Sequence, residues 1–186
     1  MSNKIKLVVA LVLSISLAAC GGGSSSSTNP LEKYVGTYTG CNNHQKSTTT
    51  ISTTSYDQAS VSTTTDIFEN SDCTGANLGT HTDSSPVTVT YRAAANLPVS
   101  GIGSTVQNLT IDIINILLPP VSQSLTGSGV NGLCVNYTGG SYCYSTPPTS
   151  AVSSEGGFYM VGNLLYSLTF VNGVYQTDSV VLTKTS

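Results

Sequence analysis

Thiol and imidazole groups are the most reactive side chains of this sequence, which has five cysteines and two histidines. Cys41-Asn42-Asn43-His44 has the spacing of two metal ligands, and His81 follows Cys73. Cys20 ends an apolar amino-terminal segment, which leaves an even set of four cysteines for disulfides. An exported chain is expected to oxidise such a set. We therefore predict disulfides and no metal site, and we expect both histidines to be solvated loop residues.

The remaining groups that could perform catalysis form no pattern of known chemistry. No serine lies in a G-x-S-x-G nucleophile elbow, and the nine acidic side chains are scattered. The glycine clusters at 127–129 and 139–140 lack the lysine and the following helix of a phosphate loop. We predict that the protein is not an enzyme and uses no cofactor.

The amino terminus has the features of a secretory signal. Lys4 and Lys6 precede an apolar run over 7–19 that is too short for a membrane-spanning helix. The run ends in Leu17-Ala18-Ala19-Cys20, which resembles the lipobox of bacterial lipoprotein precursors. The resemblance implies cleavage before Cys20, a diacylglycerol thioether on its sulfur and acylation of the new amino terminus, for example with palmitate. Three acyl chains would hold the protein stably on a membrane without spanning it.

The same resemblance bears on location and domain organisation. Enteric lipoproteins that stay in the inner membrane carry aspartate after the cysteine, and this chain has Gly21, so we expect an outer-membrane lipoprotein. Residues 20–30 are rich in Gly and Ser and are predicted to be a flexible tether. Residues 31–186 have the length of a single exported domain.

The charge of the exported part limits its partners. Four cationic side chains remain after the signal peptide is removed, against nine acidic ones, so the formal charge is 4 − 9 = −5. A mildly acidic, lysine-poor surface argues against binding to nucleic acid. The partners that we expect are the membrane, through lipid on Cys20, and either a small apolar ligand or another envelope protein.

The disulfide pairing follows from one predicted hairpin. The segment 133–144 is expected to turn at Thr138-Gly139, and if Tyr137 faces Gly140 then Cys134 faces Cys143. Directly opposed residues of an antiparallel pair are close enough for a disulfide. We therefore predict Cys134–Cys143 and, by elimination, Cys41–Cys73.

Strand signals cover most of the exported domain. Strands are predicted at 34–39, 47–54, 59–68 and 87–92, and over 158–171 with a break near Gly162-Asn163. Asn172-Gly173 between two β-rich runs is the strongest hairpin signal in the chain. The fold class is therefore mainly β, a single antiparallel barrel or sandwich.

The segment 104–118 allows two interpretations. Ser104-Thr105-Val106-Gln107 resembles a capping box, and apolar residues follow at helical spacing until Pro119-Pro120. Alternation of Leu109, Ile111 and Ile113 with polar residues favours a strand. The sequence thus permits one helix here, and in either case the apolar stripe is expected to face the core.

A second resemblance is carried by the two ends of the domain. Tyr34-Val35-Gly36-Thr37-Tyr38-Thr39-Gly40-Cys41, with a second cysteine in Asp72-Cys73-Thr74-Gly75, resembles small bacterial lipoproteins with a lipocalin-like barrel, whose first strand begins G-x-W. Tyr38 takes the place of that tryptophan, and Lys184 that of the basic residue covering it. The resemblance implies a buried Tyr38 at the closed end of the barrel, with the Lys184 stem across its ring, and an open end that holds a small apolar ligand.

Two functions follow as expectations, a ligand-holding barrel and a structural or protein-interaction module of the cell envelope. Six tyrosines of the carboxyl-terminal half are expected to pack a β core with wet hydroxyls, or else to line a pocket or a contact face. They are Tyr137, Tyr142, Tyr144, Tyr159, Tyr166 and Tyr175.

Overall fold

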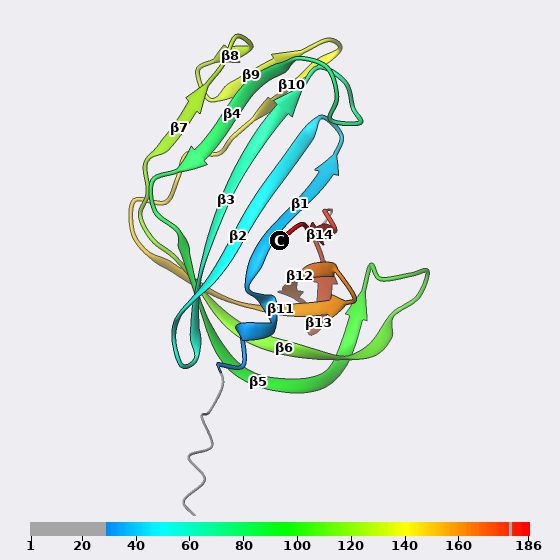
Figure 1. Ribbon diagram of the computed structural model, residues 1–186. Coiled ribbons are helices and arrows are strands. Elements are labelled where there is room, and N and C mark those ends of the chain that lie inside the picture. The colour runs from blue at the N-terminus through cyan, green and yellow to red at the C-terminus, as the bar shows by residue number, and fades with distance from the viewer. Residues whose placement is uncertain (1–28, 179) are drawn as a thin grey trace, which may run out of the picture.

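The computed structural model describes residues 29–178 and 180–186 (Figure 1). The expected signal peptide, the lipid site Cys20 and the tether up to residue 28 lie outside the described residues. The elements are η1 (Glu32–Tyr34), β1 (Gly36–Asn42), β2 (Gln45–Ser55), β3 (Gln58–Phe68), β4 (Asn77–Asp83), β5 (Val87–Ser100), β6 (Gln107–Leu118), β7 (Gln123–Thr126), β8 (Val130–Asn131), β9 (Cys134–Tyr137), β10 (Gly140–Cys143), β11 (Val152–Val161), β12 (Leu164–Val171), β13 (Val174–Thr177) and β14 (Leu182–Lys184).

Eight of these strands close into a ring, which we call the barrel. Their order is β1, β2, β3, β5, β6, β11, β12 and β14, and β14 pairs with β1 to close it. Every neighbouring pair in this ring is antiparallel. The predicted mainly β fold, a barrel or sandwich, is confirmed. A ring of eight strands has an interior that packed side chains fill or that holds one small ligand.

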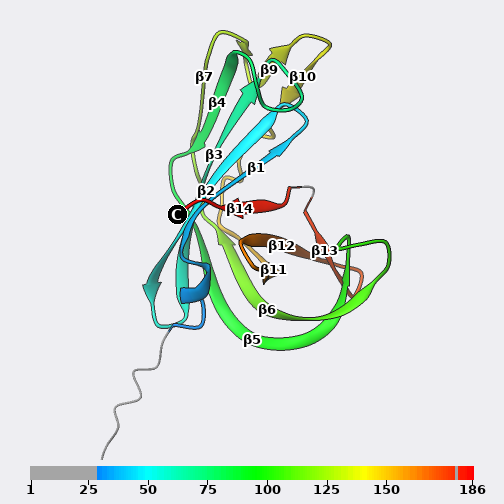
Figure 2. The ribbon, with the colours of Figure 1, turned by 45° about the vertical axis from the view of Figure 1, so that its right-hand side comes forward.

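A second, smaller ring is built from other parts of the same strands. The carboxyl-terminal half of β5 and the amino-terminal half of β6 curve away from the barrel (Figure 2). β13 closes this ring by pairing with β12 on one side and with β5 on the other. The β13–β5 pair is parallel, which departs from the antiparallel sheet that the sequence predicts. The core of the second ring consists of Val99, Ile111, Leu168 and Tyr175.

β6 belongs to the wall between the two rings. Ile114 lies in the core of the barrel, whereas Ile111 and Ile113 pack in the second ring. Both faces of the strand are therefore covered, and the helix that 104–118 permitted is not formed. The alternation of Leu109, Ile111 and Ile113 was the correct signal.

A bulge in β5 directs the chain from one ring to the other. Tyr91 pairs with Ile114 and Ala93 pairs with Ile113, so Arg92 is an extra residue on β5. An extra residue bends a strand and increases its twist. Tyr91 accordingly packs against the barrel core, while Leu97 packs in the second ring.

A two-layer region extends beyond the barrel. β4 and β7 continue the large sheet, and the three-stranded sheet of β8, β9 and β10 packs on it through β9. Val135 of β9 is fully buried, and a Cβ at Gly79 of β4 would lie 2.7 Å from the Cγ2 of Val135. Glycine at position 79 thus allows the two sheets to approach.

The strands predicted at 47–54, 59–68 and 87–92 and the two predicted hairpins are present. In the β12–β13 hairpin Asn172 and Gly173 have φ of 51° and 84°, the left-handed conformation of a two-residue turn that continues the strand twist. In the other hairpin Tyr137 faces Gly140, as predicted. The strand expected at 34–39 starts at Gly36, because η1 takes up Glu32–Tyr34.

Candidate functional site

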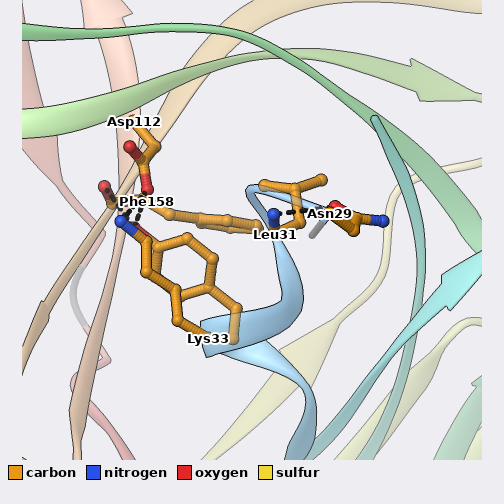
Figure 3. Close-up of polar contacts among 6 residues, drawn as sticks. Asn29, Leu31, Lys33, Asp112 and Phe158 are labelled. Carbon is orange, nitrogen blue, oxygen red and sulfur yellow. Dashed lines mark hydrogen bonds and ion pairs between the residues drawn. The ribbon is translucent and has the colours of Figure 1, made fainter. Parts of the chain in front are cut away.

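One end of the barrel is closed by η1, which places a buried polar network there (Figure 3). The hydroxyl of Tyr34 donates to the Asp112 carboxylate at 2.5 Å and to the carbonyl of Phe158 at 3.2 Å. Lys33 Nζ lies 2.6 Å from the same carboxylate, which is 4% exposed on β6. Burial, and then the hydrogen bond to Asp112, raise the pKa of Tyr34 far above its usual value. The hydroxyl therefore remains a donor, and the buried carboxylate is satisfied.

The chain that leads into η1 is fixed at the β2–β3 turn. The side-chain amide of Asn29 donates to the carbonyls of Ser55 and Gln58, and its oxygen accepts from the Leu31 amide at 2.8 Å. Leu31 is fully buried. Ordered contacts thus begin two residues before the expected start of the domain at Leu31.

Tyr38 and Lys184 lie as the lipocalin-like resemblance implies. Tyr38 is fully buried, and its hydroxyl donates to the Tyr34 carbonyl at 2.9 Å. Lys184 is its cross-strand partner on β14, with Nζ 5.8 Å from the ring centroid. Gly36 has φ of 144°, and a Cβ there would lie 2.5 Å from Lys184 Cε. Glycine at this position leaves space for the lysine stem beside the ring.

Beyond this closed end the barrel contains a cavity of about 260 Å³. Its deeper part is apolar and includes the buried side chains of Ile51, Phe158, Leu165 and Leu182. Towards the other end of the same strands the lining becomes hydroxylic. These groups belong to Ser47, Thr49, Thr63 and Ser167. The barrel therefore presents an apolar floor and a mouth that carries serine and threonine hydroxyl groups.

The charge at the mouth is negative. Asp178 is the charged member of the described lining, and it is exposed. Its carboxylate accepts a hydrogen bond from Thr169 at 3.2 Å, and its amide donates to the Ser167 carbonyl at 3.0 Å. A carboxylate at the mouth repels an anionic ligand and does not repel a neutral one.

The residues that line this cavity were not singled out by the sequence. The six tyrosines that were expected to line a pocket or pack a core lie elsewhere, since none of them is in the described lining of this cavity. Tyr175 is buried in the second ring, and Tyr159 and Tyr166 pack there as well. Ser47, Thr49 and Ile51 alternate along β2 and share its inward face, which is the signal that sequence analysis could have used.

Both predicted disulfides are present. Cys41–Cys73 joins β1 to the loop after β3, and Cys134–Cys143 joins β9 to β10. Cys134 and Cys143 are direct cross-strand partners with Cα atoms 4.0 Å apart. Cys41 is thus bonded to Cys73 rather than available for a metal ion beside His44. In the part of the chain that the structure describes, no group of three side chains is placed to hold a metal.

The two histidines attach the β9–β10 hairpin to the large sheet. The rings of His81 and Tyr144 stack with centroids 3.9 Å apart, and those of His44 and Tyr137 with centroids 4.0 Å apart. His81 is 8% exposed and lies on β4, so the expectation of a solvated loop residue is wrong for it. His44 is in the β1–β2 turn, but its ring is covered by Tyr137.

We expect His81 to make the protein less stable as the pH falls below about 6.5. Burial lowers the pKa of His81, partly opposed by the charge of Asp83. The unfolded chain therefore binds this proton at a higher pH than the folded one does, and the free energy of unfolding falls as the pH drops from the unfolded pKa to the folded pKa. Urea denaturation between pH 8 and pH 5 should show that the free energy of unfolding decreases less for His81→Phe than for the wild type. Parallel pH profiles would contradict this assignment.

Comparison with known proteins gives no relative. No family model matches the chain, and neither a curated protein nor a solved structure does. Among the described residues no helix is long and apolar enough to span a membrane.

Proposed function

We propose that this chain is a lipid-anchored protein of the bacterial outer membrane that holds a small, neutral, mainly apolar ligand in its barrel. The observation that carries the ligand proposal is the cavity of about 260 Å³ with its apolar floor. It is larger than an apolar cavity of roughly 150 Å³ that binds benzene, and smaller than the roughly 300–1,000 Å³ usual for drug-sized ligands. The cavity therefore suits a ligand that is larger than benzene and smaller than a typical drug molecule. The eight-stranded ring and the Lys184–Tyr38 contact support the same proposal.

The mouth determines which compact ligands are favoured. Serine and threonine hydroxyls both donate and accept, so they suit a ligand that carries a hydroxyl at one end. Asp178 disfavours a carboxylate at the same place. We therefore propose an alcohol-like ligand in preference to a fatty acid.

We expect 1-octanol to raise the melting temperature of the full-length protein in lipid nanodiscs, and octanoate to raise it less. At a hundred times its dissociation constant a ligand stabilises the folded state by about 2.7 kcal/mol. Ser47→Phe should remove the shift because Ser47 lines the cavity. Thr48→Phe is the matched control, since adjacent strand residues face opposite sides of the sheet.

Two results would count against the ligand proposal. One is an octanol shift of the same size in Ser47→Phe and Thr48→Phe, which would place binding outside the barrel. The other is no shift with any neutral compact compound. The protein would then be better explained as an interaction module of the envelope.

The anchor is supported by Leu17-Ala18-Ala19-Cys20 after the charged and apolar segments. We expect Cys20→Ser to abolish both lipid attachment and cleavage, because the thiol is the acceptor and lipidation precedes cleavage in lipoprotein precursors. Growth with radiolabelled palmitate, followed by gel electrophoresis, measures both. Label on the Cys20→Ser protein would contradict the assignment, and Cys41→Ser is a control that should keep the label.

A further inference from the structure

The barrel wall has a gap beside β3. β3 pairs with β5 through residues 58–61 and with β4 through 64–68. β2 pairs along the other edge of β3, so β4 and β5 lie one after the other along this edge. Residues 84–86 separate the two strands. Ser62 and Thr63 consequently have no ladder partner on this edge. Pro86, in the interrupting segment, lacks the N–H group that a ladder needs.

The gap contains a second cavity, of about 300 Å³, which we call the gap cavity. Its lining is rich in hydroxyl groups. They belong to Ser62, Thr63, Thr64, Thr82, Ser84 and Ser85. The charged member of the described lining is Asp83. Carboxylate oxygens only accept hydrogen bonds, whereas serine and threonine donate and accept, so this lining matches a neutral group with several hydroxyls. A carboxylate accepting from such a hydroxyl makes a stronger hydrogen bond than a neutral acceptor does.

The gap cavity adjoins the cavity of the barrel. Val61 and Thr63 line both. Thr63 also hydrogen-bonds to Thr49, which lines the barrel, with the two hydroxyl oxygens 3.0 Å apart. The apolar floor of the barrel, this hydroxyl pair and the hydroxyl-rich gap therefore follow one another from inside the barrel to its outside.

We propose that the two cavities form one binding site for a neutral amphiphile, with the apolar tail in the barrel and a hydroxylated head group, glycerol-like or sugar-like, in the gap cavity. This inference rests on the proposed function, because it assumes that the barrel holds the tail. It adds the chemical class of the head group and the residue that recognises it, Asp83. It also assigns a role to the interruption between β4 and β5 beside β3.

The test compares 1-O-octylglycerol with 1-octanol, which have the same tail and differ in the head group. Melting temperatures of the full-length protein are measured in nanodiscs of one lipid composition against probe concentration. The glycerol ether should reach its half-maximal shift at a concentration about tenfold lower than that of octanol, since its added hydroxyls can donate to a carboxylate. Asp83→Asn should remove this advantage and leave octanol binding unchanged. Ser62→Ala, at an exposed position, should reduce the advantage without affecting folding. Asp57→Asn, in the β2–β3 turn, is the control carboxylate.

The outcomes separate the two proposals. If both probes bind equally, depend on Ser47 and ignore Asp83, the gap cavity is not part of the site and the barrel proposal stands. Binding of the glycerol ether could instead be weakened by Asp83→Asn while Ser47→Phe has no effect on either probe. That result would contradict both the single binding site and the position of the tail in the barrel. If neither probe binds, both proposals fail.

Discussion

Replacing Tyr38 with alanine is expected to lower the free energy of unfolding by about 3–5 kcal/mol, the range for truncation of a large buried aromatic side chain. Tyr38 is fully buried in the barrel core, and its hydroxyl satisfies the Tyr34 carbonyl of η1. The substitution leaves a void at the closed end and an unpaired carbonyl beside it. Equilibrium denaturation in urea, with circular dichroism as the signal, measures the loss.

Two further variants separate the contributions at this position. Tyr38→Phe keeps the ring and removes the hydrogen bond, so it should cost about 1–3 kcal/mol for the carbonyl that loses its donor. Lys184→Met keeps a stem over the ring and removes the charge. It should cost much less than Tyr38→Ala, because a cation over an aromatic face contributes about 0.5–1 kcal/mol when exposed and about 2 kcal/mol when desolvated, and Lys184 is half-buried. A Tyr38→Ala loss below that of Lys184→Met would show that Tyr38 does not support the closed end.

Removing the Cys41–Cys73 disulfide has the second largest expected effect. The bridge closes a loop with a sequence separation of 32, and the chain-entropy model gives about 3.7 kcal/mol of stabilisation through the unfolded state. The double variant Cys41→Ser/Cys73→Ser should lose stability of that order. Urea denaturation of the oxidised wild type and the variant measures the difference.

The other disulfide provides the comparison for this prediction. Cys134–Cys143 has a sequence separation of 9, for which the same model gives about 2.7 kcal/mol. The double variant Cys134→Ser/Cys143→Ser should therefore lose less. An equal or reversed order would mean that native contacts of the two bridges, rather than loop length, determine their effects.

Local signals in the sequence were sufficient for several of the strands, for two hairpins and for the disulfide within one of them. Period-two alternation located the strand around Val89, and Asn172-Gly173 located the last hairpin. The pairing of Cys134 with Cys143 followed from the register of a single hairpin. Each of these signals lies within a few residues of the feature that it predicts.

The second ring depends on contacts that no local pattern carries. β6 has one face in each ring, so the adjacent residues Ile111 and Asp112 are both buried. A prediction that assumes one buried and one exposed face could therefore not distinguish a strand from a helix there. The bulge at Arg92 and the parallel β13–β5 pair are set by packing between distant segments.

The cavity was missed because its mouth is polar. Sequence analysis locates interior positions by hydrophobicity, and Thr49 and Thr63 face the interior with hydroxyl groups paired to each other. The burial of His81 was missed for a related reason, since its partner Tyr144 is distant in sequence and only the folded hairpin brings the rings together.

The β1–β14 pair determines when the barrel can close. Tyr38 pairs with Lys184, so the last seam joins segments at opposite ends of the domain, and β1 remains an open edge until residues 182–184 have been synthesised. Contacts between segments so distant in sequence form slowly because loop closure has an entropic cost before the contacts stabilise anything. Folding of the barrel is therefore completed after synthesis of the domain, and until then the edge of β1 that later pairs with β14 is open to pairing with another strand.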